Sequence, residues 1–148
     1  MQRYEKEKDL ICRMFDSNGY GVRDGSIPGD DFRFFLTPPG IDSESEEVFK
    51  MKGDDNVCCG AEIVMGGEIR DVFRQSKNEW EEFRDRIENL AEVKELDFFE
   101  IVDDGEDFRI SIRAEFPIGQ LSEDSFADAM NRLNSAGGSI EDLCGEYF

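Results

Sequence analysis

The chain has 148 residues, and its 36 acidic and 17 basic side chains give a net charge of −19 at neutral pH. A negative charge of this size repels nucleic-acid backbones and anionic lipid surfaces, which argues against binding to nucleic acid or to a membrane. Hydrophobic residues make up 39% of the chain, and no apolar run approaches the roughly 20 residues that a membrane span requires. Because the N-terminal segment lacks the apolar core of a secretory signal, we expect a cytoplasmic protein with a single domain over residues 1–148.

The N-terminal segment predicts a helix, a loop and a strand. Apolar side chains recur at helical spacing over residues 3–16, and Asn18 and Gly19 are typical of a helix end. A polar, glycine-containing loop is expected to follow. The run FRFFLT, residues 32–37, then predicts a strand that Pro38 ends.

Two further strands are expected to form a hairpin. Residues 47–52 and 57–65 flank the sequence GDDN, whose composition is typical of a tight turn. They therefore predict a pair of antiparallel strands. The next stretch, residues 68–75, fits either a short strand or a loop.

The central segment predicts an amphipathic helix with a clear start. Ser76 and Glu79 form a capping box, in which the Ser76 hydroxyl accepts a hydrogen bond from the Glu79 amide and the Glu79 side chain reaches back. The helix that follows carries one apolar stripe, made of Trp80, Phe83, Ile87, Leu90 and Ala91.

A second hairpin is expected over residues 97–102 and 108–116, with Asp104 and Gly105 at its turn. Apolar and polar residues alternate along residues 108–116, which predicts one buried and one polar face. Pro117 ends this strand.

The C-terminal segment predicts two helices. Ser122 is the expected N-cap of the first, which is expected to end at Gly137 and Gly138. Ser139 is then expected to cap a last short helix. The whole chain is predicted to follow the order α-β-β-β-α-β-β-α-α. Without regular βαβ alternation, this order indicates an α+β fold with a mainly antiparallel sheet of about five strands and helices packed on it.

Several kinds of chemistry find no support in the sequence. The chain contains no histidine, which removes the commonest general base and the commonest transition-metal ligand. No phosphate-binding glycine motif and no calcium-binding loop occurs. Acidic residues are so frequent that a close carboxylate pair carries no information about catalysis. We therefore expect no catalytic residue, no cofactor and no metal site.

The four cysteines, Cys12, Cys58, Cys59 and Cys144, lack the C-x-x-C spacing of metal and redox motifs. Cys58 and Cys59 are neighbours in a predicted strand, so their side chains are expected on opposite faces of the sheet. Reduced, buried thiols are the favoured interpretation, with a redox-active pair and a metal site as alternatives. Cys58 and Cys59 are accordingly the candidate reactive thiols.

The order of elements and the stretch FRISIRAEFPIGQLSEDSFADAMNRLNSAGGSIEDL, residues 108–143, carry a family resemblance. An alternating strand is followed by a short break and then by LSEDSF at a helix start. In this the chain resembles the type III secretion chaperone-like superfamily, in particular its bacterial sensory-transduction-regulator family and an uncharacterised archaeal family of the same fold. The resemblance implies a small, acidic, non-enzymatic protein that forms a homodimer and binds other polypeptides. It assigns no client-binding residue.

Two functional hypotheses follow. The first is a protein-binding module, chaperone-like or regulatory, that acts as a homodimer. Each of the pairs Phe34–Phe35 and Phe98–Phe99 must place one ring on either side of a strand, which leaves aromatic rings for a contact surface unless helices cover both faces. The candidates for this partner or dimer surface are Phe35, Phe99 and Phe148. The second hypothesis is a small ligand-binding domain, or an enzyme that uses carboxylates or thiols.

Overall fold

The computed structural model describes residues 3–103, 105 and 107–147. It contains a six-stranded antiparallel sheet with the strand order β1-β2-β3-β4-β6-β5. The strands are β1 (Gly21–Asp24), β2 (Asp30–Thr37), β3 (Glu46–Met51), β4 (Asn56–Met65), β5 (Phe98–Asp103) and β6 (Phe108–Pro117). The helices are α1 (Glu5–Ser17), α2 (Gly67–Gln75), α3 (Lys77–Glu88), α4 (Ala91–Lys94), the short 3-10 helix η1 (Ile118–Gln120) and α5 (Glu123–Tyr147). The predicted α+β class with an antiparallel sheet is confirmed.

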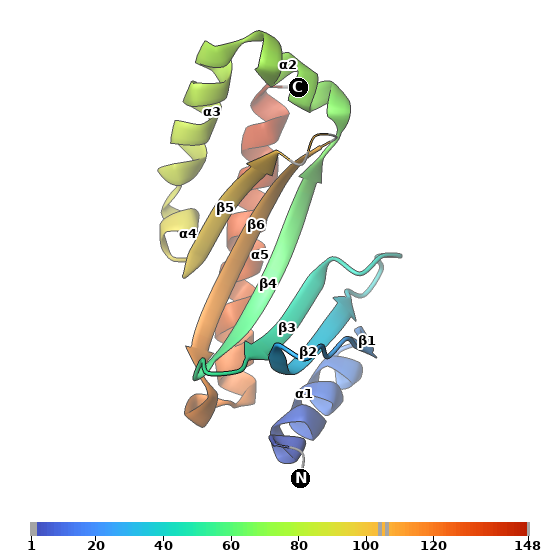
Figure 1. Ribbon diagram of the computed structural model, residues 1–148. Coiled ribbons are helices and arrows are strands. Elements are labelled where there is room, and N and C mark those ends of the chain that lie inside the picture. The colour runs from blue at the N-terminus through green and yellow to red at the C-terminus, as the bar shows by residue number, and fades with distance from the viewer. Residues whose placement is uncertain (1–2, 104, 106, 148) are drawn as a thin grey trace.

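The helices form a layer on one side of the sheet. Helix α5 runs behind β4 and β6, α1 lies at the end of the sheet near β1 and β2, α3 and α4 lie beside β5, and α2 lies near the ends of β4 and β6 (Figure 1). Aromatic rings join the two layers: Phe126 of α5 contacts Phe15 of α1 at 5.4 Å and Phe116 of β6 at 5.1 Å between ring centroids. Trp80 of α3 stacks on Phe108 at 4.7 Å. The core therefore lies between the sheet and this single helix layer.

Strand patterning explains why this side is buried. In β2 and β6 every second residue is buried, as the alternation in the sequence predicts. The β3–β4 hairpin turns through Gly53, whose φ of +85° is a backbone conformation that glycine adopts most easily. The second predicted hairpin, β5–β6, is also formed, and Gly105 at its turn has a φ of +96°, whereas Asp104 lies outside the described residues.

The helix starts predicted at Ser76 and Ser122 are confirmed. The Ser76 hydroxyl accepts a hydrogen bond from the Glu79 amide at 3.4 Å, and α3 begins at the next residue. The Ser122 hydroxyl accepts one from the Ser125 amide at 3.1 Å at the start of α5. Both side chains satisfy amide groups that have no partner within the helix.

Residues 68–75, which the sequence assigns to a strand or a loop, belong to helix α2. The reason is the spacing of Ile69 and Phe73, four residues apart, which places both on one helical face against the core. The helix is short and rich in charge, so this spacing is a weak signal in the sequence alone.

The C-terminal helix is not broken at Gly137 and Gly138, and Ser139 does not start a new helix. Helix α5 continues through all three residues to Tyr147. The apolar stripe keeps its helical spacing across the glycines through Ala136 and Ile140, both fully buried. Packing of this stripe outweighs the roughly 1 kcal/mol that each internal glycine costs relative to alanine.

Strand β1 lies where the sequence predicts a polar loop. Its four residues are largely exposed and show no apolar alternation, so no periodic signal marks them as a strand. They are ordered by hydrogen bonding to the edge of β2, with Val22 opposite Leu36. Pairing with a neighbour, rather than local sequence preference, decides this element.

Candidate functional site

The side of the sheet opposite the helices is not covered by any helix of the described chain (Figure 1). We call this side the open face and define it by the outward-pointing residues of the strands. Its central row crosses all six strands in register, through Arg23, Phe35, Glu47, Gly60, Arg113 and Phe98. The neighbouring row contains Arg33, Phe49, Cys58 and Glu115. Beyond the central row lie Glu62, Ser111 and Glu100, and then Val64, Arg109 and Val102.

The open face differs in charge from the rest of the protein. Its strands present four arginines against five acids, the acids being Asp30, Glu47, Glu62, Glu100 and Glu115. The whole chain has 17 basic and 36 acidic residues. The open face is therefore nearly neutral on a strongly acidic molecule.

Arginine side chains cover the aromatic rings of this face. The guanidinium of Arg33 lies 4.1 Å from the centroid of the Phe49 ring, and that of Arg113 lies 4.9 Å from the same ring. Arg113 also lies 4.5 Å from the Phe98 ring, and Arg23 lies 4.6 Å from Phe35. These distances are typical of cation–π contacts, which hold planar guanidinium groups against the rings.

Three of the four arginines bind carboxylates directly. Arg33 donates to Glu47 at 2.6 Å and to Asp30 at 2.7 Å, and Arg109 donates to Glu62 at 2.5 Å. Arg23 donates to Glu44, in the loop before β3, at 3.0 Å. Each of these arginines is thus satisfied by an acid on or beside the open face.

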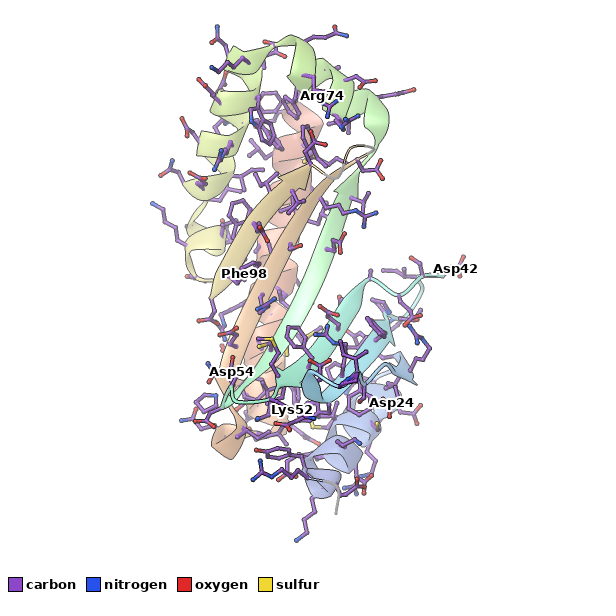
Figure 2. All side chains as sticks on the ribbon, in the orientation of Figure 1. Asp24, Asp42, Lys52, Asp54, Arg74 and Phe98 are labelled. Carbon is purple, nitrogen blue, oxygen red and sulfur yellow. The ribbon has the colours of Figure 1, made fainter. Side chains whose placement is uncertain are left out.

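A cavity of about 420 Å³ lies on the open face where β3 and β4 diverge. The two strands pair only as far as Glu46 and Ala61, whereas β4 and β6 stay paired to Met65 and Phe108. The loop between β2 and β3 forms one wall of the cavity, and β4, β6 and β5 form the other. Figure 2 shows Asp42 at the tip of this loop and Phe98 near the start of β5. Phe35, Gly60, Phe98, Ser111 and Arg113 are among the lining residues.

The aromatic candidates from the sequence divide between the two faces. Phe35 lies on the open face, half-buried, and its partner Phe34 lies in the core. The prediction that Phe99 belongs to the contact surface is wrong, because Phe99 lies opposite Ile112 on the helix-covered face and packs against the core. Phe98 takes its place on the open face. Phe148 lies outside the described residues.

The adjacent cysteines lie in β4 on opposite faces, as predicted, but their environment is that of inert thiols. Cys59 belongs to the core between sheet and helices, and Cys58 lies on the open face beneath other side chains; both are fully buried. Burial, together with the carboxylate of Glu115, raises the pKa of Cys58 to about 12, and burial raises the pKa of Cys59 further above its ordinary value. A thiol reacts as its thiolate, so burial and the raised pKa values disfavour Cys58 and Cys59 as reactive thiols.

The sequence does contain a signal for the arginines of the open face. Arg109, Ser111, Arg113 and Glu115 are the polar members of the alternating strand that the sequence predicts. An alternating polar row normally faces solvent, so this pattern alone does not indicate a site. What makes it a candidate site is the presence of two aromatic rings beside it, that of Phe49 from β3 and that of Phe98 from the neighbouring strand β5.

Neither metal-binding nor membrane-spanning features occur in the described part of the chain. Within residues 3–103, 105 and 107–147, no group of three or more acidic or cysteine side chains is arranged to hold a metal ion. Across the same residues, no helix combines the length and the apolar character needed to cross a bilayer.

Comparison with known proteins establishes the fold alone. No protein-family model matches the chain, and no curated protein does. Among solved structures, the chain is similar to an uncharacterized protein from Methanothermobacter thermautotrophicus, with a TM-score of 0.77 and 15% sequence identity. The similarity covers 95% of this chain and 98% of that one. The arrangement of sheet and helices thus occurs in a second protein of nearly the same extent.

Proposed function

We propose that this protein is a non-enzymatic protein-binding module that forms a homodimer through the open face of its sheet. The observation that carries the proposal is the nearly neutral, arginine- and phenylalanine-rich character of an uncovered sheet face on a chain of net charge −19. The family resemblance of residues 108–143 to chaperone-like proteins supports the same class of function.

Electrostatics favours this face as the place where two copies meet. Two molecules that each carry a charge of −19 repel one another over most of their surfaces. The repulsion is smallest where acids and arginines are nearly equal in number. A face that carries both signs close together is also able to complement itself across a two-fold axis, as the interface of a symmetric dimer requires.

The composition of the open face suits a protein contact. Arginine and aromatic residues are enriched in protein interfaces and dominate their energetics, since both present a large planar contact surface. Here the rings of Phe35 and Phe98 and the guanidinium of Arg113 line one cavity. A partner that enters the cavity buries both kinds of group at once.

The alternative of a thiol-dependent enzyme receives no support from the geometry. Cys58 and Cys59 are buried and their pKa values are raised, which disfavours the nucleophilic thiolate at neutral pH.

The proposal is tested by measuring molar mass with size-exclusion chromatography and light scattering. Wild-type protein is expected at twice the 17.0 kDa mass of the chain. The substitution Phe98→Asp places a charge on the open face and is expected to shift the protein towards monomer. Added sodium chloride is expected to strengthen the wild-type dimer, because it screens the repulsion between two acidic chains.

Val72→Asp is the matched control. Val72 is an exposed apolar residue of α2, so its substitution introduces the same charge away from the open face and is expected to leave the dimer intact. Circular dichroism checks that both variants are folded. A wild-type protein that stays monomeric at high concentration and high salt contradicts the proposal.

A further inference from the structure

Arg113 differs from the other arginines of the open face in having no carboxylate at hydrogen-bonding distance. Its nearest acid, Glu115, is 3.8 Å away, and its side chain makes no hydrogen bond within the described residues. The side chain is 26% exposed. A guanidinium that is mostly desolvated and still has free donors is the group on this face most in need of a partner.

The position of Arg113 prepares it for a carboxylate from outside. The rings of Phe49 and Phe98, at 4.9 and 4.5 Å, hold its guanidinium in place. Because the orientation is already set, binding a carboxylate costs little further side-chain entropy. Arg113 lines the cavity together with Ser111, whose hydroxyl also makes no side-chain hydrogen bond in the part of the chain described.

Glu100 is the complementary exception among the acids. Asp30, Glu47 and Glu62 are bound to arginines, and Glu115 accepts a hydrogen bond from the Cys58 thiol at 3.3 Å. Glu100 is exposed on β5 and makes no ion pair with any residue the structure describes. The open face of one molecule is thus left with one arginine that has no directly hydrogen-bonded carboxylate, only Glu115 at 3.8 Å, and one glutamate that has no ion pair among the described residues.

The register places these two residues as diagonal neighbours. Arg113 lies opposite Phe98, and Glu100 lies opposite Ser111, so the pair is offset by two residues across β5 and β6. Diagonal neighbours in an antiparallel pair are about 7–8 Å apart. When two copies stack with their open faces together, a two-fold axis can lie between the sheets, perpendicular to the line from Arg113 to Glu100 and level with its midpoint. This axis brings Arg113 of each molecule against Glu100 of the other.

We propose that the homodimer is held in register by two reciprocal ion pairs, in which Arg113 of each copy binds the Glu100 carboxylate of the other copy. The inference rests on the proposed function, because it assumes that a second copy covers the open face. The carboxylate enters the cavity beside Ser111 and accepts both hydrogen bonds of the guanidinium fork. Because the contact is isologous, one type of pair occurs twice.

Charge reversal tests this pairing. Glu100→Arg alone and Arg113→Glu alone each place like charges together twice, so each variant is expected to dimerise at least about tenfold more weakly than wild type. When the two variants are mixed, both pairs become opposite in charge. Native mass spectrometry is therefore expected to show a heterodimer in preference to either homodimer, and sedimentation equilibrium gives the affinities.

Two exposed residues of α3 provide controls. Glu81→Arg and Arg84→Glu carry the same charge changes on the helix side of the molecule, and their mixture is expected to give only the statistical fraction of heterodimer. If Arg113→Glu fails to fold by circular dichroism, Arg113→Gln, Glu100→Gln and the double variant are compared instead. If the two residues pair, the double variant loses no more dimer affinity than the single variant with the larger loss. If the two single losses add up in the double variant, the pairing is overturned.

The outcomes separate the two proposals. Dimers that resist both charge reversals but dissociate with Phe98→Asp overturn the Arg113–Glu100 pairing and leave the open-face dimer standing. A wild-type protein that is monomeric throughout overturns both.

Discussion

Lys50 and Asp31 form an ion pair that is buried on the helix-covered side of the sheet. The ammonium of Lys50 lies 2.6 Å from a carboxylate oxygen of Asp31 and 4.9 Å from the centroid of the Tyr4 ring, and the residue is only 2% exposed. A buried charge that loses its partner is expected to destabilise a protein strongly, since neither water nor a counter-ion then compensates it.

We therefore expect Asp31→Asn to lower the free energy of unfolding by about 3–5 kcal/mol. Replacing both partners, by Asp31→Leu with Lys50→Met, removes the charges together and is expected to recover most of this loss. Urea denaturation followed by circular dichroism at neutral pH measures both. An Asp31→Asn loss as small as that of an exposed ion pair means that Lys50 reaches water in solution.

Glu46, unlike Asp31, has a buried carboxylate oxygen without a hydrogen-bond partner among the described residues. Burial raises the pKa of Glu46 above its ordinary value of 4.5. Folding therefore favours the protonated form. This contribution to stability is fully present below the unfolded-state pKa and is lost as the pH rises through the raised folded-state pKa.

At pH 7 we expect Glu46→Gln to raise the free energy of unfolding by about 1 kcal/mol, because the amide carries no charge to desolvate. At pH 4 the gain is expected to vanish, since Glu46 is then protonated in the wild type. The neighbouring substitution Glu47→Gln removes the ion pair with Arg33 and is expected to change stability in the other direction. Equal effects of Glu46→Gln at both pH values speak against the assignment.

The choice between Phe98 and Phe99 shows how far single residues were predictable. The sequence establishes that the two rings lie on opposite sides of a strand, because side chains alternate. It contains no information on which side the helices cover. The register of β5 on β6, with Phe98 opposite Arg113, decides that Phe98 lies on the open face.

At the scale of elements, the glycines of α5 show where local preference loses to packing. Gly137 and Gly138 lie inside the helix, and a Cβ atom added at either position meets no atom within 4 Å. Alanine fits the helical backbone at both positions and has a higher helix propensity. The continuous buried stripe, rather than the glycines, determines the length of this helix.

We expect Gly137→Ala and Gly138→Ala each to raise the free energy of unfolding by about 0.5–1 kcal/mol, measured by urea denaturation. Gly53→Ala is the matched control and is expected to be destabilising, because Gly53 has a φ of +85° in the β3–β4 turn. If either helical substitution destabilises the protein, then α5 ends at the glycines in solution, as the sequence taken alone predicts.

Elements were predictable in proportion to their periodicity. Helix α3 and strand β6 carry long, regular apolar patterns, and both begin where the sequence places them. Helix α3 ends at Glu88, however, so Leu90 and Ala91 of the predicted stripe lie beyond it, and Ala91 begins α4. Strand β1 has no such pattern and exists through its hydrogen bonds to β2. Helix α2 has only three apolar residues at helical spacing, Ile69, Val72 and Phe73, which is too short a signal to separate it from a strand.

At the scale of the whole molecule, the distribution of charge matters more than its sum. A net charge of −19 excludes classes of partner but does not locate a contact. The folded sheet collects Arg23, Arg33, Arg109 and Arg113 on one face, although they are spread over 91 positions of the chain. This gathering produces the nearly neutral open face on an acidic protein.

The sequence by itself determined the class of fold, the two principal hairpins, the starts of the long helices and the absence of histidine chemistry. These features depend on periodicity and on residue types, which act over a few neighbouring positions. Only the tertiary structure decided which face of the sheet lies open, that Arg113 lies between Phe49 and Phe98, and that Glu100 lies diagonal to it. The position of Phe49 beside Arg113 depends on the pairing of β4 with β6, which are far apart in the chain. The diagonal placement of Glu100 depends on the register within the β5–β6 hairpin, and the packing of the sheet against its helices decides which side lies open.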